Sequence, residues 1–336
     1  MKNCLSNKNK EVDLRSHFYG KNKMKILEDS NGRICEYCDL INGKHVITEY
    51  EVFKGVKVFY NDIHTSKITR DISDVSLNEK IYEINHCREG RFECVLSDGT
   101  VTYMEAGDFA INLISNSSKE SFFPISHYHG VTFCITPSEF DDELKFLEKM
   151  FGIKYEDVLK KLCHDNKLFL QRATSEIEHI FFEIYKVPDD IMIGYLKVKF
   201  QELFLYLITV KNNVCYGNRQ YFVKNNIEIV KNINKYILQN FDRTLTYKKL
   251  SEKFNIKITT MKNCYKSVYG ETVNDTIIKK RLEVAASLLK NSSMLVTEVA
   301  IHVGYTDHSK FSTAFKKKYN LTPSEYKKIS KIESLV

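Results

Sequence analysis

The sequence predicts an α+β chain with a β-rich N-terminal region, a helical middle and an all-α C-terminal region. Three observations predict it. Apolar and polar residues alternate between Gly-containing turns over residues 33–136, the apolar spacing changes to three and four residues after Ser138, and two similar segments recur near the C-terminus. We therefore expect three domains, over residues 1–137, 138–222 and 223–336.

The N-terminal domain is predicted to consist of short strands joined by tight turns. Residues 81–84 lead to an expected turn at 88–90, residues 98–99 (Asp-Gly) are a strong hairpin signal, and residues 106–108 turn the chain again. Strands at this spacing favour a cupin-like β-barrel or a sandwich, and the interior of a small barrel can hold one ligand. This domain is therefore the candidate sensor of a small-molecule effector, whose identity the sequence leaves open.

The middle region carries helical patterns, and the last of them, over residues 189–210, has an apolar stripe. Earlier helical patterns cover residues 141–151, 155–163 and 165–185. The stripe consists of Leu196, Phe200, Leu203, Phe204 and Leu207. Two interpretations remain open: a surface for a homodimer, or packing against the β-domain or a neighbouring helix. Residues 210–220, with Asn and Gly, form the expected linker.

Two segments of the C-terminal region repeat one pattern. Residues 250–256 and 299–305 each place an apolar residue, a small residue, two variable residues, an apolar residue, a turn former and a final apolar residue in the same order. A second amphipathic segment follows each of them, at residues 259–269 and 308–319. Two short helices joined by a tight turn form a helix-turn-helix unit, whose second helix enters the major groove of DNA. The sequence therefore predicts two such units.

Local signals place the ends of the C-terminal helices. A helix is expected over residues 226–239, Thr272 to Asp275 can form a capping box for a long linking helix, and Pro323 can occupy the first position of the final helix. Asn255 and Gly304 fall at the two turns, where a left-handed backbone is needed. A linking helix of about 16 residues spans roughly 24 Å, which suits recognition of successive major grooves on one face of DNA.

Charge is distributed unevenly along the chain. Residues 225–336 hold 20 Lys and Arg against 10 Asp and Glu, whereas residues 1–224 hold 30 against 33. A basic domain joined to a mildly acidic one is typical of a protein that binds nucleic acid with one part only. A solvated basic surface is the alternative, and the repeat makes it the weaker one.

The order of motifs in the C-terminal region resembles the AraC/XylS family of bacterial transcription regulators over residues 228–329. The motifs are RLEVAASLL (281–289), TEVAIHVGY (297–305), SKFSTAFKK (309–317) and TPSEY (322–326). Within the family, CYKSVYG at residues 264–270 looks closest to regulators of siderophore and iron uptake. The resemblance implies double-stranded promoter DNA and RNA polymerase as partners, and activation more often than repression.

The exposed positions of the two recognition helices are the candidate DNA-binding residues. They are Thr259, Thr260, Lys262, Asn263 and Lys266 in the first unit, and His308, Ser309, Lys310, Thr313, Lys316 and Lys317 in the second. Asn can pair with adenine, Lys can donate to guanine and a Thr methyl can contact thymine. The alternative for each Lys is a phosphate contact, which we expect for residues 316–318. Family members often carry Arg where this chain has Asn263 and Thr313.

No signal for catalysis is present. The chain has no P-loop, GxSxG or dinucleotide motif, so we expect no enzyme activity, no catalytic residues and no cofactor. His127 and His129 have the spacing of cupin metal ligands, but no Glu follows at the required distance and His64 lies on another predicted segment. We therefore expect two surface histidines and no metal. A metal-dependent cupin enzyme fused to a DNA-binding domain is the remote alternative.

The remaining features indicate a cytoplasmic protein. No run approaches the ~18–20 apolar residues that cross a membrane, and residues 1–10 lack the apolar core of a signal peptide. The nine cysteines are then free thiols, with Cys35 and Cys38 as two strand residues. A second class of regulator also remains open, in which the front half binds a partner protein in place of a small molecule.

Overall fold

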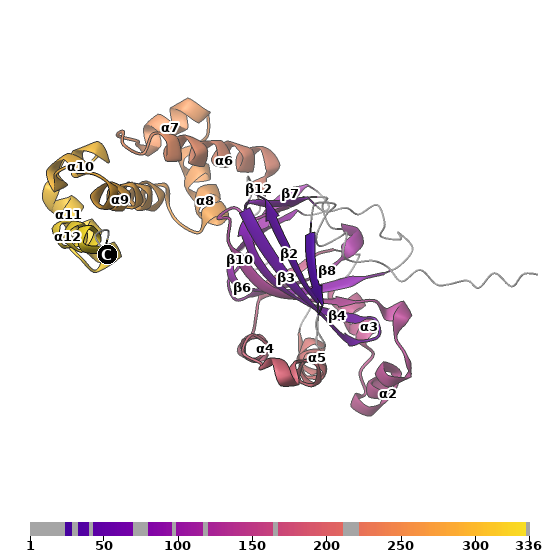
Figure 1. The fold of residues 1–336 in the computed structure, drawn as a ribbon. Helices are drawn as coiled ribbons and strands as arrows, with labels where there is room; N and C mark the ends of the chain where they lie inside the picture. Colours follow the sequence, from indigo (N-terminus) through magenta and orange to yellow (C-terminus); the bar gives the residue numbers. More distant parts are fainter. Residues whose placement is uncertain are drawn as a thin grey trace, which may run out of the picture. The chain divides into compact units, whose positions relative to one another are not determined.

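The computed structural model describes residues 24–28, 33–39, 43–69, 80–95, 99–116, 120–163, 167–210 and 222–333. The chain forms two compact units, Met1–Tyr221 and Phe222–Val336 (Figure 1). The expected linker at 210–220, apart from Val210, lies outside the described residues, as do the polar segment 1–10 and Asp98 of the expected hairpin turn.

Antiparallel strands form the main sheet of the first unit. In spatial order they are β1 (Met24–Glu28), β2 (Arg33–Asp39), β3 (Gly43–Phe53), β4 (Val56–Thr65), β10 (Tyr128–Ile135) and β6 (Tyr82–Val95). The first part of β6 also pairs with β8 (Asp108–Leu113), and its last part pairs with β7 (Thr100–Glu105). The strand β11 (Phe169–Arg172) pairs with β8, and β5 (Lys67–Thr69) with β9 (Glu120–Phe122) forms a small second sheet. Cys35 and Cys38 lie on β2, as expected of strand residues.

The described strands follow an open path. No pairing among them joins β1 to the far edge of the sheet, so the antiparallel β-structure is confirmed and a closed barrel is not. Short 3₁₀ helices at Ile114–Asn116, Pro137–Glu139 and Asp189–Ile191 link some of the elements.

Two local predictions in this unit are wrong. The expected turn at residues 88–90 does not form, because these residues belong to β6, which continues through Gly90 to Val95 with a register shift opposite His129 and Gly130. Gly90 has φ +91°, and a Cβ there would lie 2.0 Å from the carbonyl oxygen of His127. The glycine therefore lets two backbones approach each other and does not reverse the chain. The strand β11 also falls within a segment that was expected to be helical.

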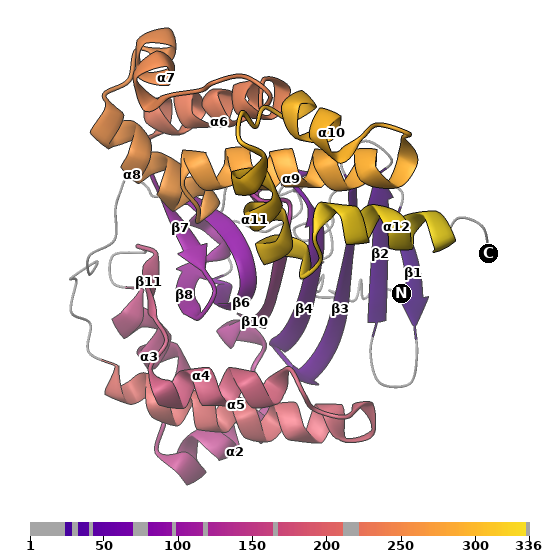
Figure 2. The ribbon, with the colours of Figure 1, turned by 90° about the vertical axis from the view of Figure 1, so that its left-hand side faces the viewer.

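Helices cover one face of the main sheet. They are α2 (Asp142–Phe151), α3 (Tyr155–Leu162), α4 (Ser175–Ile184) and α5 (Met192–Thr209), and Figure 2 shows α4 and α5 beside the strands. The helical stripe of α5 is fully buried in one core with residues of β4, β6 and β10. Phe200 contacts the rings of Phe53 and Tyr155, with centroids 5.7 and 5.2 Å away. The interpretation of this stripe as a dimer surface is therefore wrong, because the sheet already buries it.

A third histidine joins the His127 and His129 pair in the structure. His64 on β4 lies beside His127 and His129, with a ring-centroid distance of 5.3 Å to each. Strands β4 and β10 are neighbours in the sheet, and this pairing brings together residues that are far apart in the sequence.

The second unit consists of helices after the short strand β12 (Phe222–Val223). They are α6 (Lys224–Gln239), α7 (Tyr247–Phe254), α8 (Ile258–Tyr269), α9 (Val273–Asn291), α10 (Val296–His302), α11 (His308–Tyr319) and α12 (Pro323–Glu333). These bounds confirm the helices predicted from local signals. The Thr272–Asp275 capping box is formed, and Thr322 and Glu325 bond reciprocally at the start of α12. None of the described helices is both long and apolar enough to cross a membrane.

Candidate nucleic-acid interface

The sequence repeat is also a repeat of backbone geometry. After α7 the amide of Ile256 donates to the carbonyl of Ser251 at 3.2 Å, and after α10 the amide of Tyr305 donates to the carbonyl of Ala300 at 2.9 Å. Each bond spans five residues and closes the end of its helix. The turns contain Asn255 with φ +49° and Gly304 with φ +87°, so both expected left-handed positions are confirmed.

The second helix of each unit is anchored by equivalent residues. Met261 and Tyr265 of α8 are fully buried, as are Phe311 and Phe315 of α11. The ring of Tyr265 lies 4.8 Å from that of Tyr269, and the ring of Phe315 lies 4.6 Å from that of Tyr319. Because the same face of each helix is buried, the same opposite face is left on the surface.

The candidate DNA-binding residues lie on these outer faces. Thr260 is half-buried and the others are exposed. The exposed residues are Thr259, Lys262, Asn263, Lys266, His308, Ser309, Lys310, Thr313, Lys316 and Lys317. The structure thus groups them by helix, five positions on α8 and six on α11. Lys318 differs from the lysines before it, because its Nζ donates to Glu283 of α9 at 3.1 Å. A phosphate contact from Lys318 stays a prediction, and there it would compete with this ion pair.

The starts of the two recognition helices differ in how their amides are satisfied. Asp307 caps α11 by accepting from the amides of Ser309 and Lys310 at 2.8 and 3.1 Å. At α8 the capping position is Lys257, whose side chain makes no cap bond, and no acidic residue lies in the first turn. The first amides of α8 and its positive dipole end are thus suited to a phosphate. The carboxylate of Asp307 occupies the corresponding place in α11.

Helix α9 connects the two helix-turn-helix units and contacts both (Figure 2). Its 19 residues correspond to a length of about 28 Å. The guanidinium of Arg281 donates from Nε to the carbonyl of Phe241 at 2.7 Å and from a terminal nitrogen to the carbonyl of Arg243 at 3.0 Å. The same group lies 5.6 Å from the ring centre of Tyr305, just after the second turn.

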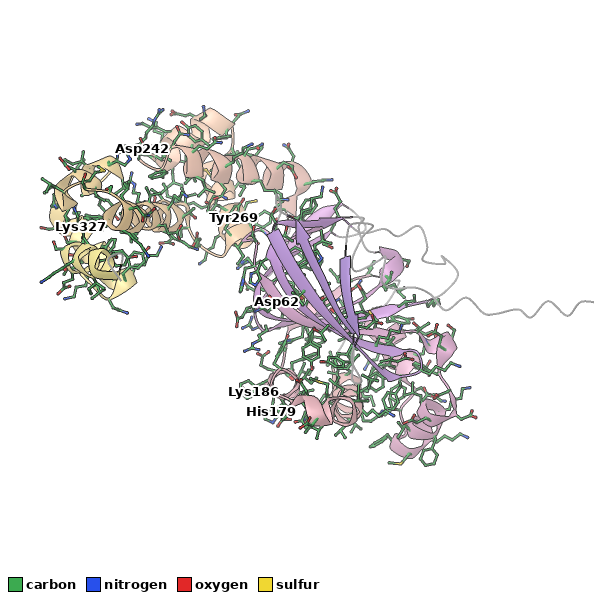
Figure 3. All side chains as sticks on the ribbon, in the orientation of Figure 1. Asp62, His179, Lys186, Asp242, Tyr269 and Lys327 are labelled. Carbon is green, nitrogen blue, oxygen red and sulfur yellow. The ribbon has the colours of Figure 1, made fainter. Side chains whose placement is uncertain are left out.

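The loop between α6 and α7 therefore packs against the second helix-turn-helix unit, formed by α10 and α11. Phe241 from this loop packs against the core of the second helix-turn-helix unit. The carbonyl oxygen of Asp242 is so close to Gly304 that a Cβ at that position would lie 2.2 Å from it. Figure 3 labels Asp242 in this loop. Sequence reasoning missed this contact. The local signal for it was the long charged side chain of Arg281 at the start of the RLEVAASLL motif.

The comparisons with known proteins concern this unit. The family model described as "Helix-turn-helix domain" matches residues 250–329. The C-terminal unit is an AraC-type helix-turn-helix domain. A similar protein is the "HTH-type transcriptional activator RhaS" of Mannheimia succiniciproducens, 31% identical over 114 residues, which are 34% of this chain and 40% of that protein.

Two further proteins are each similar to about a third of this chain. The "Bifunctional transcriptional activator/DNA repair enzyme AdaA" of Bacillus subtilis is 31% identical over 106 residues, 32% of this chain and 50% of that protein. Among solved structures, the C-terminal domain of AraT, a response regulator from Geobacillus stearothermophilus, is 31% identical with a TM-score of 0.29, and the match covers 30% of this chain and 84% of that one. The chain thus spans half or less of the two curated relatives.

Proposed function

We propose that the protein is a sequence-specific DNA-binding transcription regulator, acting as an activator at promoters. The AraC-type domain with its two outward-facing recognition helices carries the proposal. The names of RhaS and AdaA both include transcriptional activation, which supports the assignment of the same role here. RNA polymerase is the second proposed partner, because the resemblance to the AraC/XylS family implies activation through contact with it.

The two recognition helices read adjacent major grooves in this proposal. Asn263 is the proposed adenine contact, because its amide can donate and accept in one plane. Lys317 is the proposed phosphate contact near the end of α11, where it adds to affinity without selecting a base. The bridge made by Arg281 holds the two units in one arrangement, so that both half-sites are met together.

The N-terminal unit is the proposed sensor, with a cupin-like strand arrangement. This unit has a second apolar cluster, which includes Met104, Phe123 and Tyr128 and is separate from the core under the helices. A homodimer is part of the proposal, through the outer side of α5. Val198 and Leu205 are 61% and 43% exposed there, on the side opposite the buried stripe.

The proposal contains no catalytic step. The name of AdaA includes a repair enzyme, but the match covers only half of that protein and 32% of this chain. A regulator whose front unit binds a partner protein, without a small molecule, remains the second candidate.

The experiment that tests the proposal is selection of fragmented genomic DNA by the purified full-length protein, with bound sites mapped at base resolution. Discrete sites of about 20 bp upstream of genes, with two motifs one helical turn apart, are expected. A variant with Asn263→Ala is the matched comparison, and it should lose preference within one motif only. Diffuse binding without a motif in both proteins would contradict sequence-specific regulation.

A further inference from the structure

Three imidazoles meet on the surface of the N-terminal unit. His64 comes from β4, His129 from β10, and His127 from the residue just before β10. One nitrogen of each ring lies within 4.8 Å of the others, and the Nε2 atoms of His64 and His129 are 3.5 Å apart. The rings of His127 and His129 have centroids 4.5 Å apart.

The histidine cluster and the apolar cluster of Met104, Phe123 and Tyr128 lie on opposite faces of the sheet. Side chains alternate along a strand, and Ile63 and Tyr128 belong to the interior cluster. Asp62 and His64 flank Ile63, and His129 follows Tyr128, so these three lie on the other face of the sheet. Asp62, which Figure 3 labels, is 54% exposed.

Two carboxylates complete the cluster. A single oxygen of Asp62, Oδ1, lies 2.8 Å from Nε2 of His64 and 2.8 Å from Nε2 of His129. Glu89 on β6 lies behind the rings, with Oε2 3.3 Å from Nε2 of His127 and 3.7 Å from Nδ1 of His129. Asp62 thus contacts the Nε2 atoms of His64 and His129, which face each other, whereas Glu89 lies nearest the other nitrogen of His129, Nδ1.

This arrangement matches the needs of a transition-metal ion. Four ligands at about 2.0–2.1 Å around a tetrahedral Zn²⁺ stand roughly 3.3–3.4 Å from one another. The 3.5 Å between the Nε2 atoms of His64 and His129 is close to that spacing. The nitrogen of His127 lies within 4.8 Å of the other two, so it needs a shift of up to about 1.4 Å to reach that spacing. Oδ1 of Asp62 lies 2.8 Å from each of these nitrogens and needs to move outward by about 0.5 Å. Partly exposed side chains can make both shifts. Glu89 would orient His129 through its other ring nitrogen, as carboxylates behind metal-bound histidines do.

The backbone at β6 is built for this approach. The left-handed backbone of Gly90 lets the two strands approach closely, and the amide of Arg91 donates to the carbonyl of His127 at 3.3 Å. Any side chain at Gly90 would collide with that carbonyl. The strand β6 also has a bulge at Arg88, because His129 pairs with Glu89 whereas Gly130 pairs with Cys87. This register places Glu89 directly beside His129.

We propose that His64, His127, His129 and Asp62 bind one divalent first-row transition-metal ion, with Zn²⁺ as the best match to three nitrogens and one oxygen. If the ion were absent in solution, the same residues would form only a network of His–carboxylate hydrogen bonds. The site lies in the proposed sensor, so it names the chemical class of an effector, and that last step rests on the proposed function. The metal site itself does not.

The test measures metal binding by the full-length protein, kept reduced and first stripped with a chelator. Co²⁺ added to it should produce the absorption of a tetrahedral nitrogen–oxygen site, and Zn²⁺ should displace the Co²⁺ with a stoichiometry of one ion per chain. His64→Gln and His129→Gln should each abolish this stoichiometric absorption. Glu89→Gln should lower the affinity by about 10–100-fold, the usual cost of losing an outer carboxylate.

Two controls separate this site from others. His179→Gln removes a histidine of α4 that is 64% exposed and pairs only locally with Glu183, and it should leave binding unchanged. The double variant Cys35→Ser, Cys38→Ser should also bind one ion, since thiolates are not ligands here. Circular dichroism should show that all variants remain folded.

Several outcomes would overturn the proposal: no stoichiometric ion, binding that survives loss of His64 and His129 together, or binding that disappears with the cysteines. The readout requires no DNA. Its failure would leave the proposed regulator untouched, and failure of the DNA selection would leave the metal result standing.

Discussion

Replacing Gly304 with alanine tests whether the two helix-turn-helix units are held against each other. Gly304 has φ +87°, which costs an alanine about 1–2 kcal/mol. The added Cβ would also lie 2.2 Å from the carbonyl oxygen of Asp242 and 2.9 Å from the guanidinium of Arg281. Backbone cannot move aside as a flexible side chain can, so overpacking should add about 1–3 kcal/mol.

The expected loss of stability is therefore about 3 kcal/mol. Urea denaturation of the full chain, followed by far-UV circular dichroism, measures it. Asn255→Ala is the matched control, because Asn255 occupies the equivalent turn with φ +49° and already carries a Cβ. That control should cost about 1 kcal/mol at most, since only the preference of Asn for this backbone is lost.

Equal losses for Gly304→Ala and Asn255→Ala would refute the reasoning. They would mean that the loop around Asp242 moves away without an energetic cost and does not stabilise the position of the second helix-turn-helix unit. A supporting readout is DNA affinity below the unfolding transition. Gly304→Ala should weaken binding to a two-motif site more than binding to either motif alone, because it disturbs the arrangement of the units.

Three further predictions concern the DNA contacts, a buried histidine and the apolar stripe. Asn263→Ala should cost about 1–3 kcal/mol of DNA-binding free energy and relax the base preference at one position. Lys317→Ala should weaken binding to all duplexes equally and reduce the salt dependence of the affinity by about one unit of slope. Titrations of matched and altered duplexes at several salt concentrations should separate the two variants, and identical behaviour would contradict the assignment of Asn263 to a base and Lys317 to a phosphate. Burial lowers the pKa of His45 from 6.5 to about 4. The unfolded chain then binds the extra proton first, so stability should fall by about 3 kcal/mol as the pH drops from 6.5 to 4, and urea titrations of His45→Gln should lack this part of the slope. Phe200→Ala should cost about 3–5 kcal/mol because the ring is fully buried, with no change of mass in light scattering; a lost dimer with unchanged stability would restore the stripe as an interface.

The helices of the C-terminal domain were predictable because each signal acts over a few residues. Thr272 bonds the amide of Asp275 three residues later, and Asn255 needs only its own backbone preference to end α7. The repeat supported the prediction independently, because the same order of apolar and polar residues in two segments indicates that both segments pack in the same way. The exposed faces of α8 and α11 followed from the apolar spacing, because burial of one face of a helix determines the other.

The front unit was predicted less completely, because its outcome depends on which strands become neighbours. A glycine in an alternating segment marks a turn or a bulge equally well, and Gly90 could be assigned only once the carbonyl of His127 was seen against it. The stripe on α5 was equally consistent with a partner chain and with a sheet. Periodicity shows that a face is buried and says nothing of what buries it.

The sequence by itself thus determined the two helix-turn-helix units, their caps and turns, and the basic character of the domain that carries them. Only the tertiary structure decided that Arg281 ties the two units together and that His64 meets His129, 65 residues further along. The physical reason is range. Caps, turns and amphipathic spacing are set by neighbours within one or two helical turns, whereas these contacts exist only after strands and helices that are distant in the chain have packed.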